Sequence, residues 1–268
     1  MKNYHKSKLI FLLGLIVWTF GGCNKETVNL AKMTPEEQFA YAKKIFDKKD
    51  YYKAKMQFML ITMNNPGNKI VEKAQFYLAE SYYYLKEYIT AIEEYKKLIR
   101  SLPTSPYVDD ASYKIGMCYY KLSPGYALDQ EYTIKAITQF QRFLEDYPDS
   151  KLKPEVEKKL AECRNKLAKK EYKNGELYRK MGYYRAAVIS FENVLENYYD
   201  TKFADDALYW KGECLRRAGR FKEAEKAFSE FLTKYPKDNR VEKVKKKLED
   251  IKKELEHRSI ETPTRPNK

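Results

Sequence analysis

Histidine is scarce in this 268-residue chain, which holds two, His5 near the N-terminus and His257 near the C-terminus. Metal sites built on histidine, and the Ser-His or Cys-His pairs of covalent catalysis, need more imidazoles than this. The glycine-rich loops that hold phosphates, GxGxxG and GxxxxGK[ST], are also missing from the sequence. We therefore predict a non-enzymatic protein with no catalytic residue, no metal and no cofactor.

Cysteine is equally sparse, and its four copies form no CxxC pair. An odd set of three, Cys118, Cys163 and Cys214, lies beyond the N-terminal leader at wide spacing. Such a set is not a disulfide framework, so we interpret these residues as small members of the core. Acidic pairs such as Glu93 and Glu94 are expected on solvated helix faces.

Long hydrophobic runs are limited to residues 9–20 (LIFLLGLIVWTF), too short for a transmembrane helix of roughly 20 residues. Three lysines precede this run and Gly21-Gly22-Cys23 follows it, which is typical of a secretory signal. The glycine pair before Cys23 resembles the lipobox of bacterial lipoproteins. We therefore expect a signal peptide over 1–22, an acylated Cys23, and a polar tether over 23–33. In the sorting rule of such lipoproteins, Asn24 favours the outer membrane.

The formal net charge of +14 would suit a nucleic-acid binder, but an exported protein meets no genome. The basic charge is better suited to acidic partner surfaces or anionic lipid headgroups. We therefore expect no nucleic acid among the partners.

One pattern recurs along the chain: an alanine, an aromatic residue four places later and an apolar residue three further on. It begins at Ala54, Ala91, Ala136, Ala187 and Ala224, and a proline closes four of the five copies. This spacing puts the apolar residues on one helix face. A preceding segment in each unit carries an aromatic residue three places before a small one, as in Phe39 and Ala42. Paired helices at this period are typical of tetratricopeptide repeats.

The predicted fold is all-α, a tetratricopeptide-repeat solenoid of five helix pairs plus a C-terminal capping helix. Residues 34–150 hold repeats one to three, with an insertion over 123–130. Residues 154–181 read as one helix of roughly 28 residues, about 42 Å long, with Gly182 as its C-cap. It opens a second part, residues 151–257, that adds repeats four and five and a capping helix over 239–257. Residues 258–268 are expected to be a disordered tail.

The first helices of such repeats line a concave groove, and by analogy the aromatic residue of each pair and the residue seven places after it face that groove. Repeats one to three then offer a site for a peptide that ends in an aromatic residue and a carboxylate. Its predicted residues are Phe39, Lys43, Phe46, Phe76, Tyr83, Tyr84, Tyr113, Tyr120 and Lys121. In repeats four and five the same positions are Tyr172, Arg179, Tyr209 and Arg216. Packing in the core is the alternative role for each of these aromatic residues.

Residues 167–208 (LAKKEYKNGELYRKMGYYRAAVISFENVLENYYDTKFADDAL) resemble the most distinctive stretch of the BamD family, the outer-membrane lipoproteins of the β-barrel assembly machinery. Residues 127–150 (ALDQEYTIKAITQFQRFLEDYPDS), the five repeats and the lipobox resemble that family too.

This resemblance implies a lipoprotein anchored in the inner leaflet of the outer membrane and facing the periplasm. Its N-terminal repeats would help recognise the C-terminal signal of unfolded outer-membrane proteins. Its C-terminal repeats, including Tyr172, Arg179, Ser190, Tyr209 and Arg216, would dock on the periplasmic domains of a BamA-like β-barrel insertase. Accessory lipoproteins are further possible partners. Ser190 stands where the family commonly has an arginine, and a serine cannot make that arginine's charge-assisted contact.

Two other classes of protein compete with this interpretation. A periplasmic tetratricopeptide protein that coordinates cell-envelope division shares the YPDS-type repeat ends but usually lacks a lipobox. A nutrient-uptake lipoprotein that binds glycans on helical repeats is usually a much longer chain.

Overall fold

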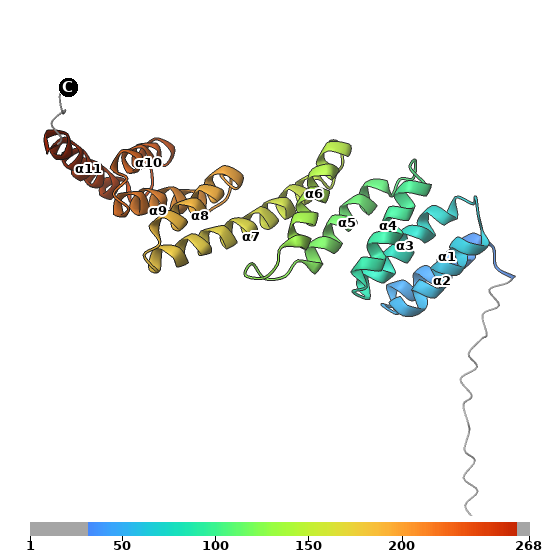
Figure 1. Cartoon of the computed structure of the whole chain (residues 1–268). Helices are drawn as coiled ribbons and strands as arrows, with labels where there is room; N and C mark the ends of the chain where they lie inside the picture. Colours follow the sequence, from blue (N-terminus) through green and yellow to red (C-terminus); the bar gives the residue numbers. More distant parts are fainter. Residues whose placement is uncertain (1–31, 262–268) are drawn as a thin grey trace, which may run out of the picture.

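The computed structural model describes residues 32–261, so the expected signal peptide, Cys23 and most of the tether lie outside the described residues. Within that range, eleven helices follow one another and each packs on the next. They are α1 (Pro35–Asp47), α2 (Tyr51–Asn64), α3 (Ile70–Tyr84), α4 (Tyr88–Ser101), α5 (Val108–Leu122), α6 (Glu131–Asp146), α7 (Lys153–Lys180), α8 (Tyr184–Asn197), α9 (Ala204–Arg217), α10 (Phe221–Lys234) and α11 (Val241–Glu261). The predicted fold class is therefore confirmed: five helix pairs and a final helix form an elongated solenoid (Figure 1).

Local sequence signals explain several helix ends. Thr34 caps α1 through a capping box with Glu37, and Pro35 begins the helix. The turns inside four pairs contain a residue with positive φ: Lys49 (65°), Lys86 (64°), Gly182 (80°) and Gly219 (74°). The first two pairs thus place a lysine where the last two place a glycine.

The long helix α7 has 28 residues and joins the two parts of the solenoid, as the unbroken sequence predicts (Figure 1). The capping helix α11 differs from expectation, because it continues past His257 to Glu261. The first four residues of the expected disordered tail are therefore helical. Arg258 explains the extension: it forms an ion pair with Glu254 one turn back, and its guanidinium carbon lies 4.4 Å from the centre of the Phe221 ring.

The buried side chains form three clusters that follow the chain: over α1–α5, around α5–α7, and over α7–α11. The aromatic residue of each repeat pattern lies at the centre of its pair and is fully buried: Phe58, Tyr95, Phe140, Phe191 and Phe228. The small residue of the first helix makes room for that ring. A methyl group at Gly212 would lie 2.7 Å from a ring carbon of Phe228, and repeats one and two have alanine at this position.

The three cysteines beyond the leader are buried and free, as predicted for core residues. Burial raises the pKa of Cys163 and of Cys214 to about 11. Among residues 32–261, no helix is long and apolar enough to span a bilayer. In the same range, no three potential ligands from His, Cys, Asp and Glu gather at a metal site.

Candidate functional site

A hollow of about 430 Å³ opens between α3 and α5. Tyr83 and Tyr84 line it from the end of α3, and Tyr113, Met117 and Lys121 line it from α5. The α5 residues are spaced four apart, which places them along one face of the helix. We call this hollow the tyrosine groove; its complete lining is Tyr83, Tyr84, Lys86, Tyr88, Tyr113, Lys114, Met117 and Lys121.

Three lysines give the tyrosine groove a positive charge. Lys114 Nζ lies 4.8 Å from the centre of the Tyr83 ring and 5.8 Å from that of Tyr84. The charge of Lys114 is already shared, because its Nζ lies 2.7 Å from a carboxylate oxygen of the buried Glu80. Lys86 and Lys121 are exposed, and neither has an ion pair within residues 32–261. Two cations at the rim are therefore available to an incoming carboxylate.

Tyr83 and Tyr113 are neutral phenols at physiological pH. Burial raises the pKa of Tyr113 to about 12 and raises that of Tyr83 further. Each ring therefore combines an apolar face with a hydroxyl that can donate a hydrogen bond. Such a surface suits the side chains and backbone carbonyls of a bound peptide.

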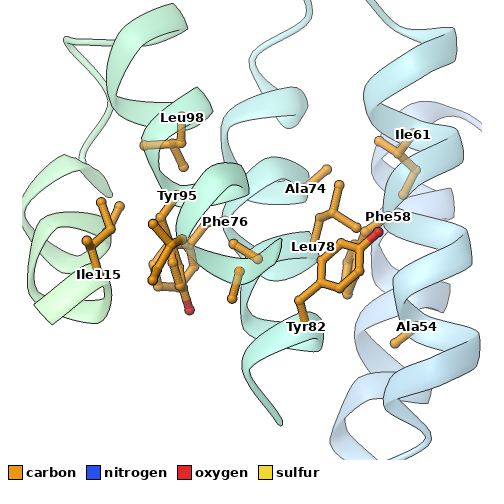
Figure 2. Packing of buried hydrophobic residues seen from close by; sticks show 14 of the residues in the cluster. Ala54, Phe58, Ile61, Ala74, Phe76, Leu78, Tyr82, Tyr95, Leu98 and Ile115 are labelled. Carbon is orange, nitrogen blue, oxygen red and sulfur yellow. The ribbon is translucent and has the colours of Figure 1, made fainter. Parts of the chain in front are cut away.

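The structure brings four of the nine predicted peptide-binding residues together in the groove: Tyr83, Tyr84, Tyr113 and Lys121. The prediction for Phe76 is wrong, because this side chain is only 9% exposed and belongs to the core. Its ring lies 5.9 Å from that of Tyr95 and stacks at 5.0 Å on that of Tyr107. Figure 2 shows Phe76 beside Tyr95, between α3 and α4.

Three predicted residues of α1 lie outside the groove and surround Tyr77 instead. The rings of Phe39 and Phe46 lie 5.7 and 5.3 Å from that of Tyr77, and Lys43 Nζ lies 5.2 Å from its centre. Phe46 also lies 5.6 Å from Tyr84, so it supports the groove from behind. This cluster fixes α1 and α2 against α3.

Tyr120 points away from the groove toward α7. Its hydroxyl donates a 2.7 Å hydrogen bond to Glu162, and Lys159 Nζ lies 4.9 Å from its ring centre. That hydrogen bond raises the pKa of Tyr120 to about 12. Tyr120 therefore joins repeat three to the long helix, a role that the sequence did not predict.

Four groove residues were missed by sequence reasoning: Lys86, Tyr88, Lys114 and Met117. Met117 had a detectable signal, because it lies midway between Tyr113 and Lys121 at helical spacing. Lys86 lies in the turn between α3 and α4, and Tyr88 is the first residue of α4. Helical periodicity gives no signal at either position.

In the C-terminal part, the side chains of Arg179 and Arg216 are half-buried. The guanidinium carbon of Arg179 lies 4.0 Å from the centre of the Trp210 ring, a cation–π contact. Arg216 Nε lies 3.5 Å from Glu213, and Arg217 donates a 3.2 Å hydrogen bond to the Tyr184 hydroxyl. We call Arg179, Trp210, Arg216, Arg217 and Tyr184 the arginine surface.

The other three predicted docking residues are buried, so the prediction that they form a surface is wrong. Tyr172 packs between Phe191 and Phe203, with ring centres 5.7 and 5.5 Å away. Tyr209 is 3% exposed and Ser190 is 6% exposed. The exposed side chains of α8 include Arg185 and Ile189.

Two arginines that the sequence did not single out hold the C-terminal part together. Arg164 of α7 donates to both carboxylate oxygens of Asp200, at 2.9 and 2.6 Å, and to the backbone of Asn197. Arg240 joins Asp206, Asp238 and Asp205 between α9 and α11. These contacts tie α7 to the segment after α8, and the segment before α11 to the start of α9.

Comparison with known proteins identifies a family and a set of similar repeat structures. A family model named YfiO, described as an outer membrane lipoprotein, matches residues 31–227. A TPR repeats protein from Bacteroides fragilis is 13% identical, with 81% of this chain and 99% of that chain covered and a TM-score of 0.48. A thermophilic TPR protein from Thermus thermophilus is 18% identical, with 81% and 98% covered and a TM-score of 0.35.

Proposed function

Because this chain belongs to the YfiO family of outer membrane lipoproteins, we propose that it is a non-enzymatic, lipid-anchored scaffold of the β-barrel assembly machinery. In this role Cys23 carries the lipid anchor, the chain faces the periplasm, and the two parts of the solenoid bind different proteins. The tyrosine groove would take the C-terminal segment of an unfolded outer-membrane protein. The arginine surface would dock on the insertase.

The observation that carries the first assignment is the combination of tyrosine rings in one groove with two lysines that have no ion pair among the described residues. A peptide that ends in an aromatic residue has a ring to stack on Tyr83 or Tyr84. Its terminal carboxylate can then reach Lys86 or Lys121 at the rim. Neither group alone would distinguish a chain terminus from an internal segment.

Fluorescence anisotropy with a peptide ending in phenylalanine tests this assignment. We expect Tyr83→Ala combined with Tyr84→Ala to weaken binding by at least about tenfold, since stacked aromatic anchors dominate such interfaces. Tyr199→Ala is the matched control, because this tyrosine is 70% exposed and lies outside the groove. Helical circular dichroism should be unchanged in all variants. Equal affinity of the double variant and the wild type would rule the groove out.

The carboxylate part of the assignment has its own test. Amidation of the peptide terminus should weaken binding to the wild type. The same amidation should have little effect on a variant that carries both Lys86→Gln and Lys121→Gln. If amidation weakens binding equally in both proteins, these lysines do not bind the carboxylate.

Docking on the insertase is proposed for the arginine surface because it is cationic and differs in composition from the groove. A pull-down of the insertase should be lost when residues 182–268 are removed, and should be retained when only 262–268 are removed. Within the full chain, we expect Arg179→Met and Arg216→Met to reduce recovery, with Arg100→Met on α4 as the control. Full recovery with both substitutions would place docking elsewhere.

Labelling with palmitate separates this proposal from the alternative of a periplasmic coordinator of envelope division. Incorporation that is lost in Cys23→Ser is the expected result. An unlabelled wild-type protein would favour the alternative.

A further inference from the structure

The outer face of α2 carries a continuous line of exposed apolar side chains. Tyr52, Met56, Leu60 and Met63 are 63, 43, 44 and 69% exposed. Their spacing of four, four and three residues places them along one side of the helix. The opposite side of α2 holds Ala54, Phe58 and Ile61 in the core. We call the four exposed residues the apolar stripe.

The equivalent positions of the other repeats show that this stripe is not a property of the fold. Counted from the alanine of each repeat, the residues at these positions are mostly polar or charged in the second helices of the other four pairs. They are Ile89, Glu93, Lys97 and Arg100 in α4; Ile134, Thr138, Arg142 and Glu145 in α6; Arg185, Ile189, Asn193 and Glu196 in α8; and Lys222, Lys226, Glu230 and Thr233 in α10. The first repeat alone among the five has an apolar outer face.

Positive charge lies at the N-terminal end of the stripe. Lys48 and Lys49 are exposed in the turn that precedes α2, and Lys53, which pairs with Asp50 at 3.1 Å, is exposed on its first turn. Between residues 32 and 69 the sequence has eight lysines and four acidic residues. An apolar helix face with lysines beside it has the composition of helices that lie in the interface of an anionic membrane.

The position of the lipid anchor places this face near a bilayer. Eleven residues lie between Cys23 and Pro35, the first residue of α1, so twelve Cα-to-Cα steps join the two. Even when fully extended, such a segment spans at most about 40–43 Å. With Cys23 acylated, α1 and α2 are therefore the helices that are tethered closest to the membrane along the chain.

We propose that the apolar stripe docks on the headgroup region of an anionic lipid bilayer, and so fixes the orientation of the solenoid on the membrane. This inference rests on the proposed lipid anchor at Cys23. Tyr52 and the flexible methionines bury their apolar atoms among the headgroups, while Lys48, Lys49 and Lys53 reach lipid phosphates.

Docking through α2 leaves the tyrosine groove free. The groove is lined by α3, α5 and the turn that leads into α4 at Tyr88, whereas the stripe lies on the outer side of α2. A membrane-bound molecule can therefore still take up a peptide.

Flotation with vesicles tests the proposal on the mature chain with Cys23→Ser, which removes the acyl chains. We expect this protein to float with vesicles of phosphatidylethanolamine and phosphatidylglycerol, and to float less with pure phosphatidylcholine. Combining Leu60→Glu with Met63→Glu should lower the fraction bound by about tenfold or more, because two charges then meet the interface. Both side chains are exposed, so the fold should tolerate the change.

Ile89→Glu combined with Ile134→Glu is the control, because it adds the same charge at exposed apolar positions of α4 and α6. Its binding to vesicles should match that of the Cys23→Ser parent. The proposal is overturned if the parent does not bind anionic vesicles, or if both double variants bind equally well.

Sedimentation velocity without lipid distinguishes other occupants of the stripe. The expected result is a monomer that the stripe substitutions leave unchanged. A dimer that Leu60→Glu and Met63→Glu dissociate would assign the stripe to a second copy of the chain. Loss of the insertase from a pull-down with the same variant, without loss of vesicle binding, would assign it to a protein. Either result overturns the membrane assignment, whereas palmitate labelling and peptide binding test the proposed function separately.

Discussion

The two parts of the solenoid use the same repeat positions for different purposes. Seven places after the aromatic residue of the first helix, repeat two has Tyr83 and repeats four and five have Arg179 and Arg216. The tyrosine takes part in an open groove, whereas the arginines lie against Trp210 and Glu213. One scaffold thereby presents an aromatic hollow at one end and a cationic surface at the other.

Both parts contain a buried glutamate that directly follows the small residue of a first helix. Glu80 pairs with Lys114 of the next first helix, and Glu213 pairs with Lys247 of α11, each at 2.7 Å. Glu80 also accepts a hydrogen bond from Tyr95, whereas repeat five has a phenylalanine at that position, which has no hydroxyl. The repeat fold is thus stabilised in a similar way at both ends, while the surfaces have diverged.

Removing the lysine partner should destabilise the C-terminal part more than the N-terminal part. Lys247→Met leaves Glu213 buried with only Arg216 nearby, so we expect a loss of about 3 kcal/mol in the free energy of unfolding. Lys114→Met should cost less, because Tyr95 still donates to Glu80. Urea denaturation followed by circular dichroism measures both. A larger loss for Lys114→Met would contradict the comparison.

Lowering the pH should change the difference in stability between the wild type and Lys247→Met. Burial tends to raise the pKa of Glu213, but the contacts with Lys247 and Arg216 outweigh it and hold that pKa below its usual value. In the wild type, Glu213 therefore adds stability above about pH 4.5, and this contribution disappears as the pH falls through the lowered pKa. In Lys247→Met, protonation instead removes an unpaired charge. The difference in stability between wild type and variant should therefore shrink on acidification, and a constant difference would exclude this pair as its cause.

Substitutions at the small residue of the first helix should also have different effects on stability in the two parts. Gly212→Ala forces a methyl group against Phe228, and we expect a loss of about 1–3 kcal/mol from overpacking. The opposite change in repeat one, Ala42→Gly, should cost only about 0.5–1 kcal/mol, through chain entropy. Thermal unfolding of both variants provides the measurement, and a harmless Gly212→Ala would show that Phe228 can move.

Substitutions in the turns inside the helix pairs should change stability by smaller amounts. Lys49 has a φ of 65°, which a glycine adopts without strain, so Lys49→Gly should stabilise the first pair by about 0.5–1 kcal/mol. Gly182→Lys should destabilise the fourth pair by a similar amount. Lys48→Gly is the matched control, because Lys48 has a φ of −77° and should gain nothing. If Lys49→Gly and Lys48→Gly change the melting temperature equally, backbone strain is not responsible.

The fold could be predicted from the sequence because each repeat contacts mainly its neighbours, so local periodicity carries most of the information. The spacing of Ala187, Phe191 and Val194 marks the second helix of its pair, and recurrence of the same spacing along the chain predicts the repeat. The run from Pro154 to Met181, with Gly175 as its one glycine and Gly182 after its end, predicted the long helix α7.

The site was harder to predict, because an aromatic residue at a helical position can face either the groove or the next repeat. Phe76, Tyr172 and Tyr209 share the register of Tyr113, yet they are buried. The rings that cover Phe76 and Tyr172 include Tyr107 and Phe203, which lie just before the next first helix. Tyr120 was misplaced because its partner Glu162 lies 42 residues away. A periodic pattern identifies a helix face, but it does not identify what lies opposite that face.

The length of α7 sets the minimum length of an extended polypeptide that runs from one end of this helix to the other. Its 28 residues extend about 42 Å at 1.5 Å per residue. An extended chain covers at most about 3.3–3.6 Å per residue, so about 12 or 13 residues are needed to run beside α7 from end to end. An extended segment shorter than this cannot run the full length of α7, whereas a longer one can contact helices at both of its ends.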